Sequence, residues 1–110
     1  LVAVADIGRV INPDIARQQI EGGLLFGMGA ATGNAVHVKR GLAGPLRLRD
    51  LDLPQLSDMP EITVELVSST EAPGGAGELG VPAVAPAIAN ALFAGSGRRF
   101  RTLPLSPGNP

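Results

Sequence analysis

A single carboxylate, Glu78, lies inside a glycine-rich segment, and this segment is the part of the chain best suited to chemistry. Residues 72–80 read Ala-Pro-Gly-Gly-Ala-Gly-Glu-Leu-Gly. Because glycine lets a backbone approach another group closely, an acid held among glycines directly before a predicted helix indicates a binding or catalytic site. The simpler interpretation is that the acid only stabilises the positive end of the helix dipole, an effect of about 0.3–1 kcal/mol.

The same glycines also fit the spacing of a dinucleotide-binding loop. Gly75-x-Gly77-x-x-Gly80 lies between a predicted strand and a predicted helix, as that motif does. However, residues 69–74 separate the strand from the first glycine, where the motif requires a tight turn, and no acid follows Glu78 to bind a ribose. A nucleotide-binding module, with NADP favoured by the arginines of residues 98–101, therefore stays an alternative and not the main interpretation.

The composition excludes several other classes of site. The 110 residues carry a net charge of −1, so nothing in the charge favours nucleic acid or an anionic membrane. The chain has no cysteine and one histidine, His37, which excludes disulfides and the usual zinc sites, so no metal-ligating residue is expected. No apolar run reaches the length of a membrane span. The apolar run that begins at residue 1 indicates a fragment of a longer globular protein.

The first of two helices is predicted to begin at Asn12-Pro13-Asp14 and to end near Ala31. Asparagine is a favoured N-cap, proline suits the first helical position, and an acid complements the dipole. Four glycines inside this range each cost about 0.5–1 kcal/mol relative to alanine, which indicates close backbone packing or a bound ligand. The alternative is a shorter helix that ends near Gly22 or Gly29.

The second helix is predicted over residues 81–94, where the apolar residues have the most regular helical spacing in the chain. Pro82 fits the first turn, whereas Pro86 could bend the helix or delay its start. Because the apolar stripe is so regular, we expect this helix to be the main core element and Leu92 to be buried.

The remaining elements are predicted from alternation and turn residues. In chain order they are a strand at 1–7, a hairpin within 34–49, a loop at 50–60, a strand at 61–68 and a last strand at 98–105. We therefore predict an α+β fold in which two helices pack on one face of a mostly antiparallel sheet. Residues 1–105 would be part of a larger domain, and residues 106–110 a tail.

Six stretches of the chain carry a family resemblance: residues 4–13, 19–23, 27–29, 73–78, 82–92 and 101–105. In this order, they resemble the C-terminal segment of the molybdenum hydroxylases, the family of xanthine dehydrogenase and aldehyde oxidase. The Pro-Gly-Gly-Ala-Gly-Glu stretch at 73–78 and the Arg-Thr-Leu-Pro-Leu stretch at 101–105 are similar to those of the large (beta) subunit in the isoquinoline 1-oxidoreductase branch. The resemblance covers nearly the whole chain and implies that the larger domain binds molybdopterin.

This resemblance implies roles for particular residues. Glu78 falls on the family's catalytic base, which activates a water-derived oxygen for attack on an electron-poor carbon. The backbone of Gly74, Gly75 and Gly77 would approach the cofactor, a molybdenum-bearing molybdopterin in its cytosine dinucleotide form. Further candidates for cofactor contact lie in the first predicted helix, at Gln19, Gly22 and Gly23.

The resemblance also implies partners. The parent enzyme would hydroxylate an N-heteroaromatic or aldehyde substrate and pass electrons to a 2Fe–2S subunit. The sequence leaves its compartment open between the bacterial cytoplasm and the periplasm. This chain would pack against the rest of the large subunit. Alone, it is expected to be inactive, to bind no molybdenum or pterin, and to expose apolar surface that favours self-association. A second alternative is a non-catalytic remnant that serves assembly only.

Overall fold

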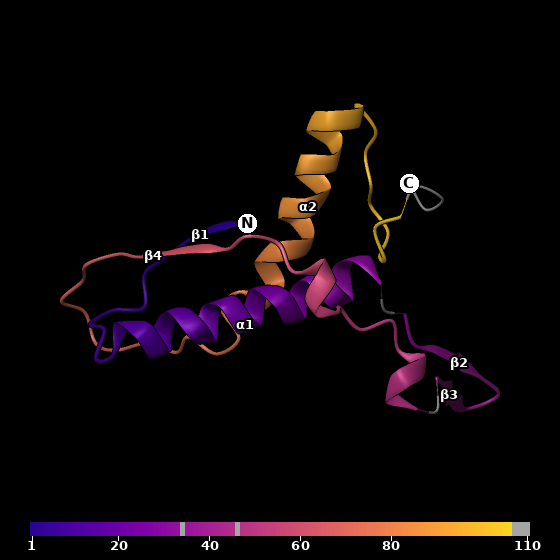
Figure 1. The fold of residues 1–110 in the computed structure, drawn as a ribbon, viewed down its shortest axis with the longest axis horizontal. Coiled ribbons are helices and arrows are strands. Elements are labelled where there is room, and N and C mark those ends of the chain that lie inside the picture. Colours follow the sequence, from indigo (N-terminus) through magenta and orange to yellow (C-terminus); the bar gives the residue numbers. More distant parts are fainter. Residues whose placement is uncertain (34, 46, 107–110) are drawn as a thin grey trace.

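A pair of short parallel strands forms one side of the core. The computed structural model describes residues 1–33, 35–45 and 47–106. Strand β1 (Val2–Ala5) pairs with β4 (Thr63–Leu66) in parallel, and the two lie side by side above the first helix in Figure 1. The carbonyls of Leu1 and Ala5 accept hydrogen bonds from the β4 side, from the Thr63 and Val67 amides, at 2.9 Å each.

The two faces of this pair differ in burial. Ala5 and Val64 point inward and are buried, whereas Val2 and Val4 are 78% and 67% exposed. The inward residues pack with side chains from both helices, and the buried core consists of Ala5, Ile7, Ile20, Leu24, Val64 and Val84. The helices therefore cover one face of the strand pair and leave the other open.

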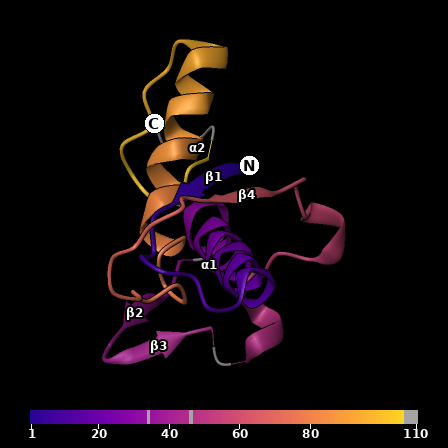
Figure 2. The same cartoon turned by 90° about the vertical axis from the view of Figure 1, so that its left-hand side faces the viewer.

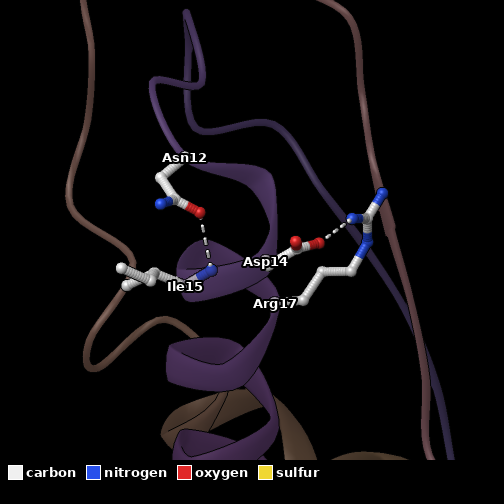
Figure 3. Close-up of polar contacts among 4 residues, drawn as sticks. All are labelled: Asn12, Asp14, Ile15 and Arg17. Carbon is white, nitrogen blue, oxygen red and sulfur yellow. Dashed lines mark hydrogen bonds and ion pairs between the residues drawn. The ribbon is translucent and has the colours of Figure 1, made fainter.

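Helix α1 (Pro13–Thr32) begins where the sequence predicts. The Asn12 side chain accepts a hydrogen bond from the Ile15 amide at 3.1 Å, and Asp14 forms an exposed ion pair with Arg17 at 3.5 Å; Figure 3 shows both contacts. The N-cap bond satisfies one of the helix's free amide donors. The helix continues through all of its glycines, so the shorter alternative that ends near Gly22 or Gly29 is wrong.

Helix α2 (Val81–Ser96) crosses α1 near its own N-terminus and then rises away from it (Figure 1). Pro82 lies in the first turn as predicted, and Pro86 is accommodated within the helix. The helix ends at Gly97, whose φ of +70° is the left-handed cap that favours glycine, and the Gly97 amide donates to the Phe93 carbonyl at 2.8 Å.

Residues 35–59, called the arm here, project beyond the end of α1 as a hairpin and then return to α1 (Figures 1 and 2), where Asp52 and Asp58 line a hollow together with Met28. They contain the antiparallel hairpin of β2 (His37–Lys39) and β3 (Leu42–Gly44), which confirms the predicted hairpin. The predicted loop that follows contains two short 3-10 helices, Leu48–Asp50 and Leu56–Asp58. No described residue of the arm is buried.

The predicted strand at 98–105 is wrong. Among the described residues after α2 the chain forms no strand and instead returns toward the end of α1, where the Leu105 amide donates to the Ala31 carbonyl at 2.7 Å. Leu105 itself is buried. A helix C-terminus leaves its last carbonyls without intrahelical partners, so a single backbone bond to one of them replaces a strand ladder. Residues 107–110 of the predicted tail lie outside the described part of the chain.

The α+β class with two helices is confirmed, but the core strands do not pair as predicted. The sheet was expected to be mostly antiparallel, whereas β1 and β4 are parallel and the antiparallel pairing belongs to the separate hairpin of the arm. Parallel strands need a long crossover connection, and α1 with the arm supplies it. In the described residues, neither helix is long and apolar enough to cross a membrane.

Candidate functional site

The glycine-rich segment of residues 72–80, called the glycine loop here, is fixed at its start by the residues that follow β1. The Gly74 amide donates to the Ile7 carbonyl at 2.8 Å, and just before the loop the Glu71 carbonyl accepts from the Arg9 amide at 2.9 Å. Between these bonds lies Gly8, with a φ of +69°. A Cβ at Gly8 would collide with the Ala72 carbonyl oxygen, so only glycine allows this approach.

The end of the glycine loop rests directly on the backbone of α1. A Cβ added at Gly80 would lie 2.7 Å from the Leu24 nitrogen and 2.9 Å from the Ile20 carbonyl oxygen. A Cβ added at Gly23 would lie 3.1 Å from the Gly77 carbonyl oxygen. These close approaches explain the glycines at 23 and 80 by packing, and they hold the loop at a fixed height above α1.

The loop and α1 together line a hollow of about 230 Å³. The glycine loop contributes Gly77 and Glu78, and the start of α2 contributes Val81. The helix contributes one face, with residues spaced as i, i+3, i+4 and i+7. The lining residues from α1 are Gln18, Gln19, Gly22, Gly23 and Phe26.

The structure therefore brings together five of the seven residues predicted from the sequence as site residues: Glu78, Gly77, Gln19, Gly22 and Gly23. Two others do not line the hollow. Gly74 is engaged in the backbone bond to Ile7, and Gly75 is exposed, with open space around the position of a Cβ.

Three lining residues were not predicted, namely Gln18, Phe26 and Val81. Phe26 is 73% exposed, and it lies one helical turn beyond Gly22 and two turns beyond Gln19. That spacing was visible in the sequence, so a helical projection from Gln19 could have found Phe26.

Glu78 is exposed and precedes α2 rather than capping it. The N-cap of α2 is Gly80, no side chain caps the helix, and its first turn contains no acid. In the described part of the chain, the carboxylate of Glu78 forms no ion pair or hydrogen bond. The helix-dipole interpretation is thus poorly supported by the geometry, and the carboxylate is available to a ligand in the hollow.

The loop geometry does not favour a nucleotide-binding motif. Residues 67–80 separate the end of β4 from the start of α2, whereas the fingerprint needs a tight strand-to-helix turn. Arg99 stacks on the ring of Phe93, 3.4 Å from the centroid, at the opposite end of α2 from the glycine loop. The arginines are therefore not placed beside the glycines.

The hollow fits one part of a large cofactor and not the whole of it. Its volume of about 230 Å³ is below the roughly 300–1,000 Å³ of a complete small-molecule site. The open space at Gly22 and Gly75, where a Cβ would meet nothing within 4 Å, leaves room for a group that approaches from outside. The described residues contain no group of three or more acids or histidines that could hold a metal ion.

Comparison with known proteins gives the same family. Residues 1–60 match the family model of a molybdopterin cofactor-binding domain. The chain is 36% identical, over 93% of its length, to the beta subunit of isoquinoline 1-oxidoreductase from Brevundimonas diminuta. It is 35% identical, over 99%, to a protein of Gluconacetobacter polyoxogenes named as a membrane-bound pyrroloquinoline-quinone aldehyde dehydrogenase. It is 34% identical, over 96%, to the molybdenum-binding subunit of an Escherichia coli aldehyde oxidoreductase.

A solved structure shares the fold. Quinoline 2-oxidoreductase from Pseudomonas putida 86 aligns with a TM-score of 0.82 and 25% identity, over 96% of this chain and 14% of that one. The chain spans only 13–16% of the length of the three relatives. Because the family model matches more than half of the 110 residues, the chain belongs to the molybdopterin cofactor-binding domain family of the molybdenum hydroxylases.

Proposed function

We propose that this chain is part of the molybdenum-binding subunit of a hydroxylase that oxidises an N-heteroaromatic or aldehyde substrate with oxygen taken from water. The names of the relatives support both substrate classes, because they include an isoquinoline and a quinoline oxidoreductase and two aldehyde-oxidising enzymes. Residues 1–105 would form part of the cofactor-binding domain.

The observation that carries this proposal is the hollow in which Glu78 faces the α1 residues of the same predicted site. Glu78 acts as the general base: its carboxylate accepts the proton from the water-derived oxygen as that oxygen attacks the substrate carbon. The close approach of Gly80 to α1 fixes the height of Glu78 above the helix. The bonds at Gly74 and Glu71 fix the other end of the loop.

The cofactor proposed for this wall is molybdopterin in its cytosine dinucleotide form. When bound, it supplies a molybdenum centre that accepts the two electrons of the oxidation. From this chain, Gly77 and Gly22 offer backbone without side chains in the way, and Gln19 offers an amide that can donate and accept hydrogen bonds. Gly23 lines the hollow through its backbone, while Gly74 and Gly75 contribute by shaping the loop.

The remainder of the subunit and a 2Fe–2S electron-transfer subunit complete the proposed enzyme. The small size of the hollow supports this proposal, because a volume of about 230 Å³ cannot enclose a pterin dinucleotide and a substrate. The same reasoning supports an inactive isolated chain that retains no molybdenum.

The decisive experiment replaces Glu78 by glutamine in the complete enzyme. Glu78→Gln preserves the shape of the side chain and removes its basicity, so turnover should fall by about 10²–10⁴-fold, while molybdenum and pterin contents stay unchanged. The matched control is Glu71→Gln, an exposed acid seven residues earlier that does not line the hollow. The control should leave turnover unaltered.

Turnover and cofactor content must be measured on the same preparation. Near-normal turnover of the Glu78 variant at full cofactor content would refute the role of Glu78 as base. Loss of molybdenum from the Glu78 variant, with turnover per bound molybdenum unchanged, would instead assign Glu78 to cofactor binding. Detection of stoichiometric molybdenum on the isolated 110-residue chain would contradict the proposal that other parts of the subunit are required.

A further inference from the structure

Strand β1 has one edge without a neighbour. The strand order of its sheet is β1–β4, so in the described residues β1 pairs on one side only. The carbonyls of Leu1 and Ala5 face β4, because they accept the Thr63 and Val67 amides. Backbone groups alternate from side to side along a strand, and the amides and carbonyls of Val2 and Val4 therefore face the open edge.

A groove runs along this open edge. It has a volume of about 410 Å³ and is bounded on one side by β1 and on the other by α2, and Figure 2 shows β1 on the α2 side of the strand pair. Ile20 and Leu24 of α1 line it as well. The residues that α2 and its preceding loop contribute are all small or apolar: Leu79, Gly80, Ala83, Val84 and Ala87.

The combination of an open edge and an apolar groove matches the requirements of an added strand. A strand that pairs with Val2 and Val4 would satisfy their backbone groups, and its alternate side chains would enter the groove. Parallel sheets in proteins are almost always covered on both faces, and a two-stranded sheet alone is marginally stable. The side chains of Val2 and Val4 are exposed. In the described residues, this two-stranded parallel sheet therefore lacks both the cover and the number of strands that such sheets usually have.

We infer that the groove between β1 and α2 accepts an extended segment of the remaining molybdenum-binding subunit, which adds a third strand to the sheet beside β1. This inference rests on the proposed function. The length of the relatives supports this occupant, because the chain spans only 13–16% of them. The segment carries apolar side chains at alternate positions, because the groove offers apolar surface to the face that turns inward.

A second copy of this chain is a less suitable occupant. The side chains that β1 turns toward the core include Ala3 and Ala5, which are small. If two β1 edges paired, each groove of about 410 Å³ would therefore receive mainly these alanine methyl groups, which fill little of it. The experiment below nevertheless distinguishes the two occupants.

The groove can be tested directly on the isolated chain with a synthetic strand. The probe is the blocked peptide acetyl-Lys-Thr-Val-Thr-Val-Thr-Lys-amide, and the control is the same peptide with both valine nitrogens methylated, which removes two backbone donors. At millimolar concentration the probe should shift the NMR signals of the Val2 and Val4 amides and of the Ala83 and Ala87 methyls. The methylated peptide should not.

A variant pair locates the contact. Val4→Pro removes the amide donor at the open edge, a position where proline is tolerated in edge strands, and should abolish the shifts caused by the probe. Val4→Thr preserves the donor and should retain them. Unchanged amide signals of α1 show that the proline variant is folded, and if it is not folded the methylated peptide supplies the same comparison.

The occupant is tested by amide hydrogen exchange in the complete subunit. The Val2 and Val4 amides should exchange at least about tenfold more slowly there than in the isolated chain. Absence of probe-induced shifts at β1, or equal exchange in both samples, would overturn the inference. Dimerisation of the isolated chain with protection at Val2 and Val4 would replace the proposed occupant by a second copy. These readouts need neither turnover nor molybdenum, so they stand or fall separately from the role of Glu78.

Discussion

Helices α1 and α2 differ in how well the apolar pattern of their sequence agrees with which residues are buried. In α1, all of which the structure describes, the buried residues include three glycines at 23, 27 and 29. In α2, also fully described, the apolar spacing is the more regular, yet Val84 is its one buried residue. The difference shows that close backbone contact, and not the regularity of an apolar stripe, determines which helix forms the centre of this core.

The prediction that α2 is the main core element is therefore wrong. Leu92 is 37% exposed, and it lines an open apolar hollow of about 400 Å³ along α2 together with Leu1 and Ile88. The helix buries its first turns against α1, where Gly80 and Gly27 allow contact, and then leaves the surface of the core. The rest of its apolar stripe stays partly exposed along that hollow.

The largest difference between the helices should come from a charge placed in the centre of α1. Ile20 is 1% exposed, so Ile20→Asp buries a carboxylate among apolar side chains and should destabilise the chain by several kcal/mol. For a small domain that is enough to abolish the thermal unfolding transition. A cooperative melt close to that of the unsubstituted chain would show that α1 is not the central helix.

A smaller loss of stability should follow from a methyl group at the crossing of the two helices. The backbone of Gly80 is already helical, with φ of −72°, so Gly80→Ala introduces no dihedral strain. The added Cβ would nevertheless lie 2.7 Å from the Leu24 nitrogen, which should cost about 1–3 kcal/mol through overpacking. Chemical denaturation measures this difference.

The matched control is Gly95→Ala, near the far end of α2, where a Cβ would meet nothing within 4 Å. Here alanine should stabilise the chain by about 0.5–1 kcal/mol, because it favours the helix. If the two substitutions had equal effects on stability, contact at Gly80 would not be what limits how closely the helices approach.

The smallest effect should come from a charge at Leu92 in the isolated chain. Because this side chain is partly exposed, Leu92→Asp should change the free energy of unfolding by less than about 1 kcal/mol. In the complete subunit the same substitution should impair assembly, measured as loss of soluble subunit. Unfolding of the isolated chain by Leu92→Asp would restore α2 to the core.

The sequence was sufficient to predict the elements whose signals are local. The N-cap at Asn12 and the hairpin of residues 37–44 both depend on neighbours within a few positions. The parallel pairing of β1 with β4 could not be predicted, because strand alternation specifies which residues face inward and does not specify the partner strand. The packing role of Gly23 likewise depends on Gly77 and Gly80, far away in the chain.

The bond between the Leu105 amide and the Ala31 carbonyl has a mechanical consequence. Two rods that touch at one crossing can pivot about it, and the close contact at Gly80 alone would leave α2 such a rod. The segment after Gly97 runs from the tip of α2 back to the end of α1 (Figure 1) and forms the third side of a triangle. If α2 tilts away from α1, this segment must therefore stretch or its bond to the Ala31 carbonyl must break. The orientation of α2, and of Glu78 just before its N-cap, is thereby coupled to the C-terminal end of α1.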